Sequence, residues 1–157
     1  MTRLYGRAPR GARCHASAPC GRWQTTTMIS SVRLDGTTAA MTIAGATDTE
    51  VFRAYVAEVL CPSLQRGDIV IMDNLAPHKS DPTLALISQA GAQVLFLPAY
   101  SPDFNPIEKM WSKVKSLLRS TEARTPSDLT SAIGHALAQV TPKDAIGWFA
   151  SCGYSFC

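Results

Sequence analysis

Two short apolar runs separated by a helical segment constrain the fold of this chain more than any other feature of its sequence. Residues 69–72 (IVIM) and 94–97 (VLFL) have the unbroken hydrophobic character of strands that are buried on both faces. Between them, Asp81-Pro82 is typical of a helix start and Gly91 of a helix end. A strand–helix–strand succession of this length requires a crossover between parallel strands. The sequence therefore predicts an α/β fold.

The rest of the chain predicts a hairpin and several further helices. Residues 23–34 and 37–45 are rich in β-forming residues and flank Asp35-Gly36, which is a strong hairpin signal. Apolar spacing predicts a helix over 48–60, with Asp48 or Thr49 as its cap. Further helices are expected from Asn105 to about Arg119, around residues 129–140, and from Thr141 to Phe149.

Positive charge is unevenly distributed along the chain. The whole chain has a net charge of +3, but residues 1–34 contain six arginines and no acidic residue. Residues 1–22, rich in Gly, Pro and Arg, are interpreted as a basic arm before a folded domain over 23–157. The predicted helix from Asn105 carries a second basic group, Lys109, Lys113, Lys115 and Arg119. Such clusters suit a phosphate backbone, although a solvated helix face is the commoner cause of a lysine run.

Two acidic residues follow the predicted parallel strands. Asp73 comes directly after residues 69–72, at the carboxyl end where open α/β sheets place their sites, although Asp-Asn also opens turns. Glu108 lies in the first turn of its helix, where it would complete a capping box or bind a metal. Asp73 directly follows the first of the two predicted parallel strands, and Glu108 lies in the helix that the chain enters after the second. Together they predict a site for Mg²⁺, which in pairs of ions supports phosphoryl transfer.

Several segments resemble the catalytic domain of mariner-type bacterial insertion-sequence transposases, which belong to the DDE superfamily. They are IVIMDNLAPHKS, VLFLPAYSPDFNPIEKMWSKVKSLLR, RTPSDLTSAIGHALAQV and WFASCGY. The resemblance implies a ribonuclease H-like mixed sheet flanked by helices, and DNA transposition by metal-dependent strand cleavage and transfer. It implies that Asp73 is the second catalytic acid and Glu108 the third, and that both bind Mg²⁺ or Mn²⁺.

The same resemblance suggests roles for neighbouring residues and for partners. Asn74 is expected to shape the turn after Asp73, and His78 either to contact a phosphate or orient a ligand, or to be an ordinary loop histidine. The basic residues Lys109, Lys113, Lys115 and Arg119 are candidates for contacts with the DNA backbone, which position DNA without reading its sequence. The expected partners are double-stranded DNA, at the element ends and the target, and another copy of the chain or a full-length transposase.

One member of the catalytic triad has no candidate in this sequence. In the family the first acid lies just before the RLYGRAPRG segment, whereas no Asp or Glu precedes Asp35 here. The helix-turn-helix region of the family is also missing. We therefore expect an N-terminally truncated domain without its first, central strand, inactive alone unless an upstream or frameshifted segment supplies the acid. Two alternatives remain. The chain is either a non-catalytic module that binds DNA or transposase, or a remnant that does not fold independently.

Location follows from what the sequence does not contain. No apolar run approaches the roughly 18 residues of a membrane span. The N-terminal residues include arginines but no apolar core of a secretory signal. The sequence therefore predicts a cytoplasmic, nucleoid-associated protein with no membrane partner.

Overall fold

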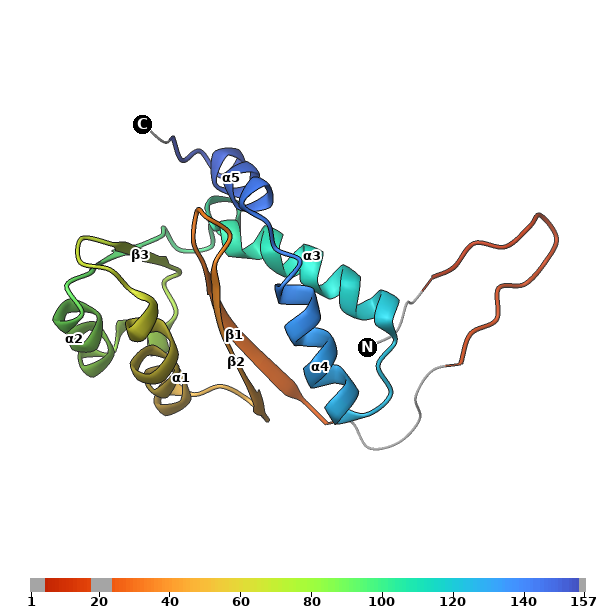
Figure 1. Cartoon of the computed structure of the whole chain (residues 1–157), viewed down its shortest axis with the longest axis horizontal. Helices are drawn as coiled ribbons and strands as arrows, with labels where there is room; N and C mark the ends of the chain where they lie inside the picture. Colours follow the sequence, from red (N-terminus) through yellow and green to blue (C-terminus); the bar gives the residue numbers. More distant parts are fainter. Residues whose placement is uncertain (1–4, 18–23, 156–157) are drawn as a thin grey trace. The chain divides into compact units, whose positions relative to one another are not determined.

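The predicted strand–helix–strand unit is present in the computed structural model, which describes residues 5–17 and 24–155 (Figure 1). Strands β3 (Ile69–Met72) and β4 (Gln93–Phe96) pair in parallel, and helix α2 (Asp81–Gln89) connects them. The N-cap lies one residue earlier than predicted, because Ser80 is the N-cap and Asp81, the predicted cap, is the first residue of the helix. Gly91 has a φ of +81°, so it follows the helix in the left-handed conformation that glycine favours.

The parallel strands are buried on one face only, so the prediction that both faces are buried is wrong. Side chains alternate along a strand, and Val70 and Met72 face the core formed by α1 and α2. On the opposite face, Ile69 is 61% exposed and Leu95 is 52% exposed. The apolar run alone does not reveal this difference, because burial depends on which helices cover each face.

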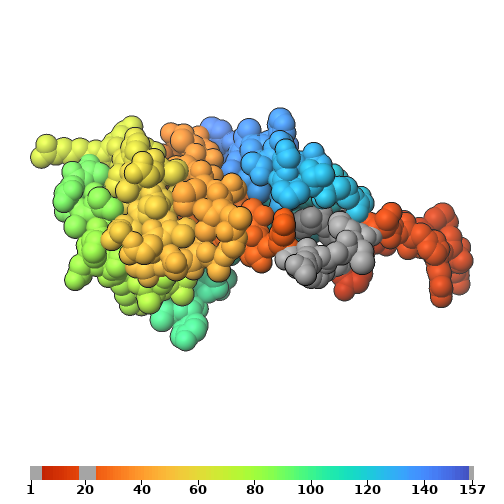
Figure 2. Space-filling view, turned by 90° about the horizontal axis from the view of Figure 1, so that it is seen from below, coloured from red at the N-terminus to blue at the C-terminus, as the bar shows by residue number. Residues whose placement is uncertain are grey.

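The core beside this sheet comes mainly from one helical segment. Helix α1 (Thr49–Tyr55) continues as a π-helix over Val56–Leu60 and a 3₁₀ turn over Cys61–Ser63. Asp48 caps it, as predicted, because its Oδ1 accepts a hydrogen bond from Val51 N at 2.9 Å. Phe52, Tyr55 and Val56 are buried against residues of β3 and α2. In the space-filling view the gold surface around α1 lies directly against the green surface around α2 (Figure 2).

The predicted hairpin is confirmed. Strands β1 (Thr26–Val32) and β2 (Thr38–Ala44) pair antiparallel across the Asp35-Gly36 turn. Asp35 Oδ1 accepts a hydrogen bond from Thr37 N at 2.8 Å, which closes the turn. Gly36 has a φ of +84°, and a Cβ there would lie 2.8 Å from the backbone of Thr141. Both the conformation and the space therefore require glycine at this position.

The strands form two separate sheets, which corrects the prediction of one mixed sheet. Within residues 24–155, β1 pairs only with β2 and β3 pairs only with β4. No described strand lies between β1 and β3, so each keeps an edge whose backbone groups have no strand partner. An ion pair joins the two sheets instead, because the Arg33 guanidinium donates to both carboxylate oxygens of Asp68 at 2.5 and 3.0 Å. The mixed α/β class itself is confirmed.

The C-terminal half is helical, as predicted. Its helices are α3 (Pro106–Thr121), α4 (Pro126–Leu137) and α5 (Pro142–Ser151). The apolar stripe of α3 is buried at Met110, Val114 and Leu118. Thr141 and Asp144 form a reciprocal capping box at the start of α5. No helix within residues 5–17 and 24–155 has both the length and the apolar character needed to cross a membrane.

The chain divides into two compact units. Unit 1 consists of residues 1–23 and 111–139, and unit 2 of residues 24–110 and 140–157. The described part of the predicted arm, residues 5–17, contains no helix or strand, and residues 1–4 and 18–22 lie outside the described residues. Asp73, His78 and Glu108 all belong to unit 2.

Candidate functional site

Asp73 lies at the carboxyl end of β3, where the parallel ladder stops. Leu97 N donates to Met72 O at 2.9 Å, so backbone pairing continues up to the residue before Asp73. Its Oδ1 accepts a hydrogen bond from Leu75 N at 3.2 Å, which bends the chain into the 3₁₀ turn over Ala76–Lys79. The turn-opening role proposed for this aspartate is therefore observed. The side chain is 45% exposed, so the carboxylate also reaches solvent.

His78 is brought back against Asp73 by that turn. Its Nδ1 lies 2.6 Å from Asp73 Oδ1, and only 19% of its side chain is exposed. The imidazole packs on the ring of Phe52, with centroids 4.2 Å apart and planes inclined by 36°. Although the distance is short, the N–H direction is not aligned with Oδ1, and the buried Nδ1 has no other hydrogen-bond partner among the described residues. His78 is thus a largely buried, packed side chain, and its predicted role toward a phosphate or a ligand stays a prediction.

Asn74 is exposed and lies inside the same turn. The turn itself is closed by the carboxylate of Asp73 and by a backbone bond from His78 N to Leu75 O at 3.0 Å. The contacts that shape the turn therefore come from its neighbours, and a supporting role for the Asn74 side chain stays a prediction.

Glu108 is held differently, by its position in a helix. Asn105 Oδ1 accepts a hydrogen bond from Ile107 N at 3.3 Å, and Asn105 O accepts one from Glu108 N at 3.2 Å. The backbone N–H of Asn105, which a capping box would join to the Glu108 carboxylate, donates to Pro102 O at 2.9 Å instead. Glu108 is exposed, and its carboxylate has no hydrogen-bond or ion-pair partner among the described residues. The capping-box explanation for Glu108 is therefore wrong, and its oxygens remain available.

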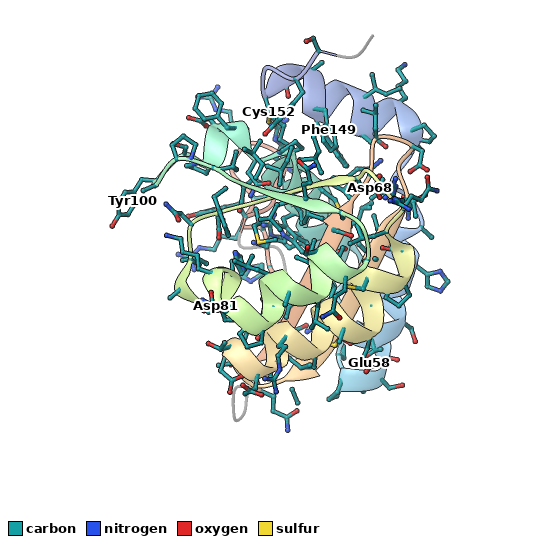
Figure 3. All side chains as sticks on the ribbon, turned by 90° about the vertical axis from the view of Figure 1, so that its left-hand side faces the viewer. Glu58, Asp68, Asp81, Tyr100, Phe149 and Cys152 are labelled. Carbon is teal, nitrogen blue, oxygen red and sulfur yellow. The ribbon has the colours of Figure 1, made fainter. Side chains whose placement is uncertain are left out.

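The loop that leads from β4 to Glu108 is anchored at one end and exposed at its centre. Tyr154 OH donates to Phe104 O at 2.9 Å, which ties the 3₁₀ turn over Pro102–Phe104 to the segment after α5. Tyr100 is fully exposed and has a φ of 57°, a left-handed conformation that is uncommon for a bulky residue. It points away from the other labelled side chains (Figure 3).

The described residues offer suitable ligand atoms for a divalent metal but not a complete set. Asp73 Oδ2 and both oxygens of Glu108 have no partner in the described part, and carboxylate oxygens are the ligands that Mg²⁺ prefers. Within residues 5–17 and 24–155, however, no three His, Cys, Asp or Glu side chains gather around one point. No hydrogen-bond or ion-pair partner is shared by Asp73 and Glu108. The structure therefore brings Asp73 and His78 together, while no hydrogen bond or ion pair among the described residues links Glu108 to either of them.

The basic residues of α3 divide into two kinds. Lys109, Lys115 and Arg119 are exposed on the side of the helix away from its buried stripe. Lys113 is half-buried, and its Nζ donates to Gln139 O at 2.7 Å at the end of α4. That ammonium is already engaged within unit 1, so the three exposed residues are the better candidates for phosphate contacts.

Sequence reasoning missed two residues of this site. Phe52 lies within the helix predicted over 48–60 from its apolar spacing, and nothing in the sequence indicates that it packs on His78. Tyr154 lies within the WFASCGY segment, but its bond to Phe104 O joins positions far apart in the chain.

The fold is that of a mixed α/β domain in which two acidic residues, Asp73 and Glu108, follow the parallel strands. The sequence profile of the DDE superfamily endonuclease family matches residues 1–130, a span that includes Asp73, His78 and Glu108. The chain therefore belongs to this family. A domain of this family implies DNA as a substrate and normally works with a divalent metal. No curated protein matches the chain in sequence.

Proposed function

We propose that this chain is the nuclease part of an insertion-sequence transposase of the mariner type, with Asp73 and Glu108 as catalytic acids. Residues 23–157 would form the nuclease domain and residues 1–22 a basic arm. The best support for this proposal is the family match, which spans both acids. In addition, Asp73 Oδ2 and both oxygens of Glu108 have no hydrogen-bond or ion-pair partner among the described residues. A protein with this role acts on DNA at the nucleoid.

The chemistry assigned to the site is cleavage and transfer of DNA strands. A divalent metal, when bound, stabilises the charge that develops on the phosphate oxygens. Asp73 and Glu108 would hold Mg²⁺ or Mn²⁺, Asp73 through Oδ2 because its Oδ1 is already engaged. Lys109, Lys115 and Arg119 would contact the phosphate backbone and position the strand. Self-association or pairing with a full-length transposase is part of the same proposal.

Two carboxylates are too few ligands for the pair of hard cations that this chemistry uses. We therefore propose that the chain does not cleave DNA alone and that a third acid comes from outside the described residues. The unpaired edges of β1 and β3 support a second candidate function, a module that binds another transposase chain without chemistry.

Mn²⁺ binding followed by electron paramagnetic resonance tests the role of the acids directly. We expect Asp73→Asn and Glu108→Gln each to weaken binding, whereas Glu58→Gln, an exposed acid on the π-helix, serves as the matched control and should not. Equal binding by all four proteins would remove Asp73 and Glu108 from the metal site.

A plasmid-nicking assay with Mg²⁺ or Mn²⁺ separates the candidate functions. We expect DNA binding that weakens steeply with salt, and no cleavage by the chain alone. Cleavage that disappears with Asp73→Asn would overturn the proposed inactivity and support the catalytic acids. Inhibition of a full-length transposase without DNA cleavage would favour the binding module.

A further inference from the structure

We propose that His78 is the positioning residue of Asp73. Its imidazole packs against Phe52 and donates a hydrogen bond from Nδ1–H to Asp73 Oδ1. This leaves Oδ2 as the oxygen that binds a cation. This inference rests on the proposed role of Asp73 as a metal ligand and adds the group that orients it.

The first support is the unequal use of the two carboxylate oxygens. Oδ1 accepts from Leu75 N at 3.2 Å and lies 2.6 Å from His78 Nδ1, whereas Oδ2 has no partner among the described residues. The terminal torsion of an aspartate is otherwise broad. The hydrogen bond from Leu75 N restricts that torsion, and the Nδ1 proton assigned here to His78 adds a second donor on the same oxygen, so the direction of Oδ2 is set before any ligand arrives.

The second support is the burial of His78 Nδ1. An unpaired buried N–H costs about 1–3 kcal/mol, and Nδ1 has no aligned partner in the described part of the chain. Asp73 Oδ1, at 2.6 Å, is the acceptor within reach. In the proposed arrangement the Nδ1 proton is directed at this oxygen, which satisfies Nδ1 and strengthens the hold on the carboxylate.

The third support is that the ring is fixed from the core side. Phe52 is 6% exposed and belongs to the hydrophobic core, and its ring centroid lies 4.2 Å from that of His78. His78 thus links the buried face of α1 to the carboxyl end of β3. Groups that orient metal ligands in this way typically change metal affinity by about 10- to 100-fold when they are removed.

The position of the imidazole proton tests the contact itself, without any metal. Long-range ¹⁵N NMR of the imidazole, at a pH where the ring is neutral, should show the proton of His78 on Nδ1. Asp73→Ala removes the acceptor and should move the proton to Nε2, while the spectrum of His135, which is exposed on α4, stays unchanged. A wild-type ring with its proton on Nε2 would overturn the proposal.

Two substitutions then separate positioning from packing. His78→Leu keeps an apolar side chain against Phe52 but removes the donor, whereas His78→Asn keeps a donor near the place of Nδ1. We expect His78→Leu to weaken Mn²⁺ binding by about 10-fold or more without a matching loss of thermal stability, and His78→Asn to restore most of the affinity. His135→Leu is the matched control.

The possible failures are distinguishable. If both His78 variants bind Mn²⁺ like the wild type while Asp73→Asn does not, the positioning role is wrong and the proposed function stands. If Asp73→Asn also binds like the wild type, or if the wild type binds no Mn²⁺, the metal role of Asp73 is wrong, and the NMR experiment still decides whether His78 donates to it.

Discussion

The two ends of β3 each carry an aspartate, and the two aspartates are used differently. Asp68, before the strand, accepts two hydrogen bonds from Arg33 and one from Gln65 N. Asp73, after the strand, has contacts on Oδ1 only. Both carboxylate oxygens of Asp68 therefore accept hydrogen bonds, whereas Asp73 Oδ2 has no partner among the described residues. This difference indicates a structural role for Asp68 and leaves Asp73 with an oxygen available for the ligand-binding role proposed above.

The largest expected effect comes from removing the packing behind the Asp73 end. Phe52→Ala deletes a buried aromatic side chain beside His78 and should lower the free energy of unfolding by about 3–5 kcal/mol. Urea denaturation measures this loss. Phe52→Leu is the milder control, because it keeps most of the apolar volume, and an equal loss in both variants would argue against packing as the cause.

A smaller loss is expected at the Asp68 end. Arg33→Met keeps the aliphatic stem and removes the bidentate ion pair, and it should cost about 1–2 kcal/mol because both side chains are partly exposed to solvent. The exposed pair of Arg53 and Glu50 provides the control, since Arg53→Met should change stability much less. A result in the opposite order would mean that the Arg33–Asp68 contact does not hold the two sheets together.

The pH dependence of stability should report the same ion pair. Hydrogen bonds from Arg33, and then from Gln65 N, hold the pKa of Asp68 below its ordinary value. The ionised carboxylate therefore stabilises the fold above the unfolded-state pKa of about 3.9, and this contribution disappears as the pH falls through the lower folded-state pKa. Denaturation curves across this range should show a shallower acid slope for Asp68→Asn. An unchanged slope would exclude Asp68 as its source.

The smallest stability change is expected at Asp73 itself. Asp73→Asn keeps an oxygen that can accept from Leu75 N and His78, so the free energy of unfolding should change by less than about 0.5 kcal/mol. Mn²⁺ binding by the same variant should nevertheless fall. A loss of stability comparable to that of Arg33→Met would erase the distinction between the two ends of β3.

Local signals in the sequence predicted most of the elements because they depend on residues close in the chain. The Asp35-Gly36 turn, the Asp48 cap and the Thr141–Asp144 box all join residues within three positions of one another. Strand β3 matches its predicted bounds, because a run of four apolar residues followed by Asp73 marks clearly where the strand begins and ends. Both candidate acids were found because they follow the ends of the parallel strands.

Contacts between distant segments could not be predicted in this way. The exposure of Ile69 and Leu95 depends on which face of the sheet the helices cover. The packing of Phe52 on His78 and the bond from Tyr154 to Phe104 join segments that only the folded chain brings together. The division into two sheets likewise follows from which strand edges meet.

The sequence by itself determined the α/β class, the order of the elements and the presence of an acid after each parallel strand, because propensity, capping and periodicity act over one or two turns. Only the tertiary structure decided what each acid can do. Leu75 N donates to Asp73 Oδ1, and His78 lies beside the same oxygen. The N–H of Asn105 donates to Pro102 O, so the Glu108 carboxylate forms no capping box. The carboxylate of Asp68 accepts hydrogen bonds from Arg33 through both oxygens. Whether a carboxylate keeps a free oxygen depends on its neighbours in space, and those neighbours are set by long-range packing.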